Sequence, residues 1–120
     1  MRHQYFSFTS ASFTDLVAHD GAGRIRTARV MDEACRSSFR FIDLTEIPPG
    51  SSVGVHTHAD DEEIYVIISG RGWMVLDGET FEVGPGDVIR NVPRGTHGLA
   101  NAGSEILTMV VLDVASAQSR

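Results

Sequence analysis

The sequence predicts an all-β protein, a barrel or a sandwich. Apolar residues recur with a period of two in short segments, such as Tyr65 and Ile67 or Leu107, Met109 and Val111. Alternation of this kind is typical of strands that are buried on one face. Clusters of glycine, proline and aspartate separate the segments, and regularly spaced short strands with such turns are typical of barrels and sandwiches.

Ten strands are expected along the chain. The dipeptide Asp77-Gly78 lies between two alternating segments and predicts a tight hairpin, because both residues tolerate positive φ. Only residues 11–22 and 31–37 could hold a short helix. The expected strands lie near residues 4–9, 25–30, 38–46, 52–58, 62–69, 72–77, 80–83, 87–92, 97–101 and 105–114.

Length and composition indicate one domain, residues 1–120. A chain of 120 residues with 42% hydrophobic and 22% charged residues can bury roughly two thirds of the surface that its unfolded form exposes. We therefore expect one core and no second domain.

The charged residues exclude several classes of function. All ten cationic residues are arginine, and the formal net charge is −6, so a phosphate backbone would be repelled and nucleic acid is not expected as a partner. The absence of lysine from the sequence excludes Schiff-base chemistry and a P-loop, because both need its amine.

The single cysteine, Cys35, can form neither an intramolecular disulfide nor a thiolate metal cluster. This fits a reducing cytoplasm, where we expect the protein to reside. The first ten residues lack the apolar stretch of a signal peptide. The longest apolar run, residues 64–68, is far shorter than the roughly 20 residues that span a bilayer, so no membrane association is expected.

Two histidines and a carboxylate are expected to converge near the middle of the chain. His56 and His58 are two apart on an expected strand, so both imidazoles point to the same face. After a four-residue polar connection, Glu63 begins the next expected strand and can lie directly across from His58, roughly 5 Å away. Glu62 competes for the role, but adjacent strand residues point to opposite faces, so only one of the two can join the histidines.

This set of side chains predicts a metal site. Imidazole suits zinc, copper, iron or nickel, and two histidines with one carboxylate are the ligands of many non-haem iron sites. Taken alone, each part has a simpler interpretation. A single histidine on a strand is usually a hydrogen-bonded or surface residue, and an acidic run is usually a solvated loop.

At these residues the sequence resembles the cupin family. Its first motif is matched over residues 50–72, with both internal spacers kept, by Gly50, His56, His58, Glu63 and Gly70. The match selects Glu63 over Glu62.

The second cupin motif is matched over residues 86–101 by Gly86, His97 and Asn101. Pro93 and Gly95 each lie one residue later than the motif has them, whereas His97 keeps its distance from Gly86. The resemblance implies a double-stranded β-helix (jelly-roll) barrel with one divalent metal, of iron, manganese, nickel, zinc or copper. The implied ligands are His56, His58, Glu63 and His97.

Residues alternating with these ligands are expected to line an apolar pocket for a small, partly hydrophobic molecule. Tyr65 is the candidate proton donor. Arg40 could anchor a carboxylate or phosphate, although a surface role is favoured. His3 and His19 are expected to be solvent-exposed, and Asn101 to serve in a turn or to support a metal ligand, not to act as a catalyst. The other expected lining residues are Ile67, Trp73, Val75, Leu99, Met109 and Val111.

We expect a metal-dependent enzyme acting on a small organic molecule. Cupins of this size include dioxygenases, decarboxylases, isomerases and cyclases, and the sequence does not choose among them. The alternative is a non-catalytic module that binds or senses a sugar or other metabolite. A homodimer is expected from the resemblance and from residues 1–10, whose YFSF segment would be an unpaired edge strand.

Overall fold

The computed structural model describes residues 5–31 and 38–115 of the chain. Within them a short 3₁₀ helix, η1 (Phe8–Ser10), is followed by ten strands. The strands are β1 (Thr14–Leu16), β2 (Ile25–Met31), β3 (Phe39–Ile47), β4 (Ser52–Thr57), β5 (Asp61–Ser69), β6 (Gly72–Leu76), β7 (Glu79–Val83), β8 (Val88–Asn91), β9 (Thr96–Asn101) and β10 (Leu107–Ala115).

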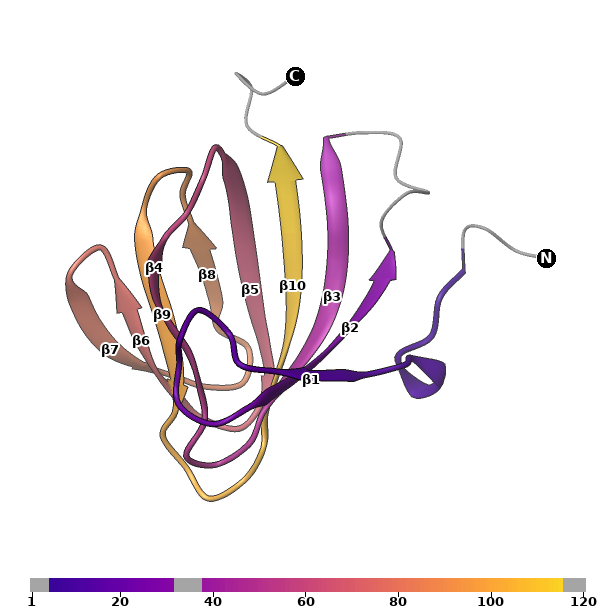
Figure 1. Cartoon of the computed structure of the whole chain (residues 1–120), viewed down its shortest axis with the longest axis horizontal. Coiled ribbons are helices and arrows are strands. Elements are labelled where there is room, and N and C mark those ends of the chain that lie inside the picture. Colours follow the sequence, from indigo (N-terminus) through magenta and orange to yellow (C-terminus); the bar gives the residue numbers. More distant parts are fainter. Residues whose placement is uncertain (1–4, 32–37, 116–120) are drawn as a thin grey trace.

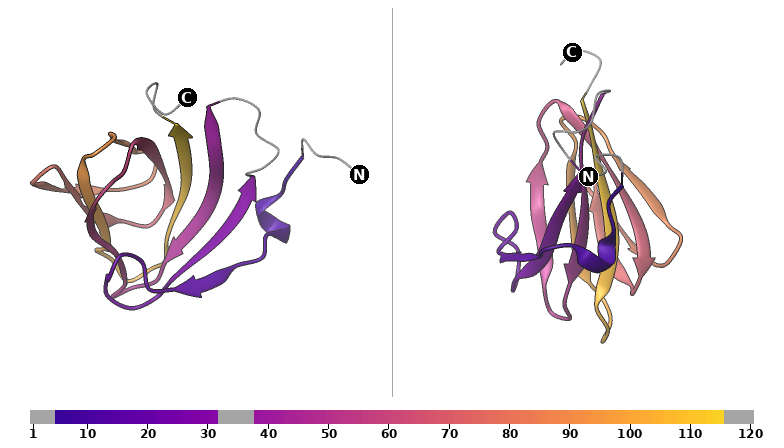
Figure 2. Two further views of the ribbon diagram at one scale, coloured as in Figure 1. Left: turned by 45° about the horizontal axis from the view of Figure 1, so that its top comes forward. Right: turned by 90° about the vertical axis from the view of Figure 1, so that its right-hand side faces the viewer.

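The strands form two antiparallel sheets, as the sequence predicts for a jelly-roll barrel. One sheet has six strands in the order β1-β2-β3-β10-β5-β8, and the other has four in the order β4-β9-β6-β7. Figure 1 shows the two sheets facing each other around a common interior, and Figure 2 shows the curvature of the larger sheet from two further directions. Consecutive strands β4 and β5 lie in different sheets, so the chain crosses the barrel between them.

The core lies between the sheets, on the faces that the alternation predicts. Tyr65, Ile67, Leu99, Met109 and Val111 are buried there as expected, with exposed fractions between 1 and 6%. The prediction for β6 is wrong by one residue: Trp73 is 49% exposed, Val75 is only partly buried, and Met74 is fully buried in the core. All of β6 is apolar apart from its first glycine, so alternation within it could not define the inner face.

The first strand is also placed differently. Residues 5–10 form no strand; Ser7 accepts a hydrogen bond from the Thr9 amide and begins the 3₁₀ turn instead. The first strand is β1, which pairs with β2 through Thr14 and Thr27. Three residues are too few to produce a detectable period, and the short helix that residues 11–22 could hold does not form. Of the second possible helix, 31–37, Met31 ends β2 and the rest lies outside the described residues.

The remaining strand predictions are confirmed within one or two residues. Asp77 and Gly78 both have positive φ, 48° and 87°, and they connect β6 to β7 as a hairpin. Within residues 5–31 and 38–115, no helix is long and apolar enough to cross a membrane.

Candidate metal centre

Three imidazoles meet inside the barrel, at one end of the four-stranded sheet. His56 on β4 is the register partner of His97 on β9, and their ring centroids are 4.4 Å apart. His58 follows β4 directly, and its ring centroid is 5.3 Å from that of His97. One nitrogen from each ring lies within 4.8 Å of the other two. The structure thus brings together the three histidines that the motifs selected.

The displaced turn of the second motif is joined to the first motif by backbone hydrogen bonds. The His58 amide donates to the Gly95 carbonyl, and the Arg94 amide donates to the Ala59 carbonyl, each at 2.8 Å. Arg94 has a positive φ of 62°. This turn holds the start of β9 against the end of β4, so His97 keeps its place although Pro93 and Gly95 are shifted in sequence.

Hydrogen bonds donated by the Nδ1 atoms leave the Nε2 atoms of two imidazoles available for a metal. His56 Nδ1 lies 2.8 Å from the Gly54 carbonyl oxygen, which can only accept. His58 Nδ1 lies 2.9 Å from Asp61 Oδ1. In the neutral ring each Nδ1 therefore carries the proton and Nε2 carries the lone pair that a metal needs. Burial lowers the pKa of His56, which favours this neutral form.

Glu63 approaches the histidines from the opposite sheet. Its Oε1 lies 3.3 Å from His58 Nε2 and 3.5 Å from His97 Nε2. Burial would raise the pKa of this carboxyl, but the neighbouring His97 and His58 lower it below the usual value, so Glu63 stays ionised.

The reason given for Glu63 from the sequence is wrong, although the contact exists. His58 and Glu63 are not a cross-strand pair, because β4 and β5 belong to different sheets; the pair meets across the barrel interior. Glu62 points away from the histidines and pairs with Arg90 at 3.1 Å on the surface.

The donor set fits a divalent metal. His97 is fully buried, and among the described residues neither of its nitrogens, nor His56 Nε2, has a hydrogen-bond partner. Buried polar atoms are rarely left without partners, and converging imidazole lone pairs beside a carboxylate are what a transition metal would satisfy.

A buried pair of carboxyl groups lies behind His58. Asp61 and Asp113 are 9% and 1% exposed. Burial and, after it, the adjacent Asp61 carboxyl with its negative charge together raise the pKa of Asp113 to about 8. Asp113 is therefore protonated at neutral pH, and Asp61 remains an acceptor for His58 Nδ1. Arg40 reaches this pair from the rim: its Nε lies 3.6 Å from Asp113 Oδ1, while its side chain is 56% exposed.

Two residues near the centre could not be recognised from the sequence as neighbours of the metal ligands. His19 is exposed as expected, but its ring also stacks on that of His56, with centroids 3.4 Å and planes 8° apart. Asn91 is fully buried opposite Glu63 in the sheet register, and neither atom of its amide has a hydrogen-bond partner among the described residues. Both residues reach the centre only because segments distant in the sequence fold together.

The two other polar residues considered from the sequence lie away from the centre or outside the description. His3 lies outside the described residues, and Asn101 serves in a turn, where its side chain accepts a hydrogen bond from the Gly103 amide.

A cavity of about 320 Å³ adjoins the centre on the inner face of the six-stranded sheet. Glu63, Tyr65 and His19, which line it, are each in contact with one of the clustered histidines. Its polar groups farther out are the Thr27–Thr45 hydroxyl pair, 3.0 Å apart, and Arg29, which binds Asp43 through two hydrogen bonds. The apolar lining comes from Leu16, Ile25, Phe41, Val53, Met109 and Val111.

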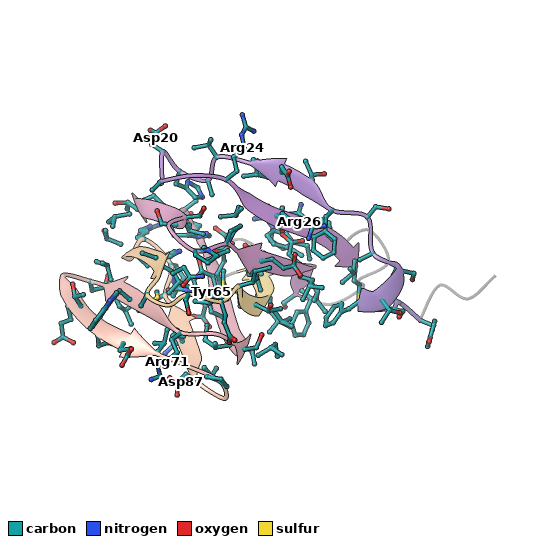
Figure 3. The ribbon with its side chains drawn as sticks, turned by 90° about the horizontal axis from the view of Figure 1, so that it is seen from below. Asp20, Arg24, Arg26, Tyr65, Arg71 and Asp87 are labelled. Carbon is teal, nitrogen blue, oxygen red and sulfur yellow. The ribbon has the colours of Figure 1, made fainter. Side chains whose placement is uncertain are left out.

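Tyr65 lies between the sheets in the middle of the barrel, as Figure 3 shows, while Asp20 and Arg24 point away from it on the loop before β2. Its ring meets that of His97 edge to face at 5.7 Å. Burial, together with the Glu63 carboxylate, raises the pKa of the phenol far above its usual range. The hydroxyl therefore keeps its proton and can donate a hydrogen bond into the cavity.

A jelly-roll barrel with this histidine cluster is the architecture of the cupins, and residues 43–114 match the cupin domain family. The chain belongs to that family. It is 32% identical to an oxalate-binding protein of Thermotoga maritima over 96 residues, which are 77% of this chain and 79% of that protein. It is 47% identical to an uncharacterized protein of Methanocaldococcus jannaschii over 58 residues, 48% of this chain and 46% of that relative.

A solved structure agrees with this assignment. The crystal structure of a predicted oxalate decarboxylase from Thermotoga maritima superposes with a TM-score of 0.89 at 25% identity, over 93% of this chain and 99% of that one.

Proposed function

We propose that this cupin is a metal-dependent enzyme that acts on a small organic acid. The observation that carries the proposal is the convergence of three imidazoles and Glu63, with imidazole nitrogens that lack hydrogen-bond partners among the described residues, beside a cavity that Glu63 lines. His56, His58, His97 and Glu63 would hold the ion. A bound metal would polarise a carbonyl or hydroxyl oxygen of the ligand, or activate dioxygen if it were iron.

The expected ligand is a 2-hydroxy or 2-oxo acid with an apolar body. A cavity of about 320 Å³ would hold about ten water molecules, at the roughly 30 Å³ that each occupies in the liquid. Oxalate has two carbons and no apolar surface, so it would leave the outer part of the cavity unfilled. The apolar lining of the cavity, which includes Phe41, Val53 and Met109, favours an apolar group.

The residues around the cavity would orient that ligand. The protonated Tyr65 hydroxyl would donate a hydrogen bond to a ligand oxygen near Glu63. The Thr27 and Thr45 hydroxyls would meet a polar group at the far end. Arg29 is largely neutralised by Asp43, so a second carboxylate there is not expected.

The alternative is a binding module in which the metal only orients the ligand. It is favoured by the likeness to a protein whose name records binding rather than turnover. Metal analysis of protein purified without chelators, followed by ligand and activity screens of the loaded form in air, separates the two functions.

The metal site is tested by replacing each histidine of the cluster with alanine. We expect His56→Ala, His58→Ala and His97→Ala each to lose most of the bound metal, because the remaining ligands form a poorer set. Stoichiometric metal in all three variants would refute the site. A 2-oxo acid should raise the melting temperature of the metal-loaded parent but not that of His97→Ala.

A homodimer is also proposed, with the outer face of the six-stranded sheet as its interface. The register places apolar side chains side by side across this face, and Val88 and Ile68 are 64% and 52% exposed. Such a face can pack on a second copy of itself across a two-fold axis. The expectation from residues 1–10 loses its basis, since residues 5–10 form no strand. The apolar stripe consists of Ile42, Ile64, Val66, Val88, Val110 and Leu112.

Light scattering tests the interface. Val88→Arg should give a monomer at tens of micromolar, whereas Thr80→Arg, an exposed change on the other sheet, should remain dimeric. A monomeric parent would refute the dimer, and a dimeric Val88→Arg would place the interface elsewhere. The cytoplasm remains the expected compartment.

A further inference from the structure

The loop between β1 and β2 is fastened to β4, the strand that carries His56. The Gly54 amide donates to the Ala18 carbonyl at 2.9 Å, and Ala18 also forms a parallel bridge with Val53. Farther along, the Ser52 amide donates to the Ala22 carbonyl at 2.8 Å, and the Ala22 amide donates to Ser52 Oγ at 2.9 Å. Figure 1 shows this indigo loop passing beside β4. These bonds fix His19 between two anchored residues.

The loop adopts a conformation that most residues avoid. His19 and its neighbour Asp20 have positive φ, 50° and 58°. In a left-handed conformation the Cβ of a residue with a side chain lies too close to the following carbonyl oxygen, which makes the conformation unfavourable. Gly54 permits the close approach, because a Cβ there would lie 2.0 Å from the His19 carbonyl oxygen. Two left-handed residues and a glycine opposite them thus hold the His19 ring in one place.

In this position His19 cannot bind the metal ion that His56 would hold. The two rings are 3.4 Å apart and nearly parallel. An imidazole nitrogen binds a metal in the plane of its ring, so an ion in the plane of the His56 ring lies out of reach of the His19 lone pair. The ring instead lines the cavity, together with Glu63 and Tyr65.

We propose that His19 is a ligand-contacting residue, which hydrogen-bonds a carboxylate oxygen of the acid held at the metal. The proposal rests on the proposed function, because it needs an acid in the cavity. His19 and Tyr65 both line the cavity, and each contacts one of the clustered histidines, His19 through His56 and Tyr65 through His97. A carboxylate beside the histidines would therefore meet an imidazole N–H and a phenol O–H. Both groups donate, and hydrogen bonds to a charged acceptor are stronger than neutral ones. Stacking on His56 fixes the direction of the donor.

Two substitutions separate a hydrogen bond from a merely structural stack. His19→Phe keeps a ring that can stack on His56 but cannot donate. His19→Asn loses the ring, keeps a donor and tolerates positive φ. The control is Asp20→Asn, which changes the exposed neighbour while keeping a side chain suited to its left-handed backbone.

The experiment is calorimetric titration of phenylpyruvate, a 2-oxo acid with an apolar body, into protein loaded with one metal ion per chain. His19→Phe should bind the metal as the parent does but the acid at least tenfold more weakly, the size expected for a hydrogen bond to a charged group. His19→Asn should bind the acid more tightly than His19→Phe, and Asp20→Asn should match the parent.

Three outcomes overturn the proposal. Equal affinity of the parent and His19→Phe for the acid would leave His19 a stacking residue, with the proposed function intact. Loss of the metal from His19→Phe would make it a support of the metal site instead. A parent that takes up the metal but binds no acid would overturn the proposed function together with this inference.

Discussion

Replacing Glu63 by glutamine tests the proposed metal site most directly. The change removes one negative charge and keeps the size and shape of the side chain. In the structure the Glu63 carboxylate is the only charged group described within 3.5 Å of both His58 Nε2 and His97 Nε2. A metal ion at this position would therefore lose its anionic ligand.

The expected loss of metal affinity is at least 100-fold. Replacing a residue that only supports a metal ligand typically costs 10–100-fold, so loss of a ligand should reach or exceed the upper end of that range. A 100-fold loss corresponds to about 2.8 kcal/mol, at about 1.4 kcal/mol per factor of ten. The measurement is calorimetric titration of the metal into protein that has been freed of metal with a chelator.

The matched control is Glu62→Gln, one residue away on the same strand. Glu62 pairs with Arg90, whose side chain is 69% exposed, and an exposed ion pair contributes about 0–1 kcal/mol to stability. Metal affinity should be unchanged in this variant. Equal losses in the two variants, or a larger loss in Glu62→Gln, would refute the assignment of Glu63.

Three further predictions concern the surroundings of the metal. Asp61→Asn should weaken metal binding by about 10-fold or more, because His58 Nδ1 loses its charged acceptor, whereas calorimetry of Asp60→Asn, an exposed neighbour, should show no change. Gly54→Ala should lower the free energy of unfolding by roughly 1–3 kcal/mol, because the new Cβ meets the His19 carbonyl oxygen. Thermal unfolding measures this loss. An equal loss in Gly103→Ala, where a Cβ has room, would contradict the reason. Removal of the metal should lower the melting temperature and its return should restore it, so identical melting curves would count against a metal bound by the folded protein.

Much of the fold and of the candidate site could be predicted from the sequence, because both depend on local patterns. Alternation of apolar residues places nine of the ten strands. The two-residue spacing of His56, on β4, and His58, directly after it, sends both imidazoles to one side. The hairpin at Asp77-Gly78 follows from two residues that tolerate positive φ.

Prediction failed where the local pattern was weak. Strand β6 is apolar at every position after its glycine, so the register with β9 decides that Met74, and not Trp73, faces the core. Strand β1 has only three residues, and it is recognised as a strand mainly because it pairs with β2. In both cases contacts with a neighbouring strand override what the segment indicates by itself.

The sequence by itself determined nine of the ten described strands, the hairpin at Asp77-Gly78 and three histidines with the spacing of metal ligands. Only the tertiary structure decided that Glu63 reaches those histidines across the barrel from the other sheet, and that His19 stacks on His56 over the end of the cavity. Periodicity and spacing describe residues within about one strand and turn of each other. Contacts between distant segments depend on how the two sheets close around the core, and no local pattern records that closure.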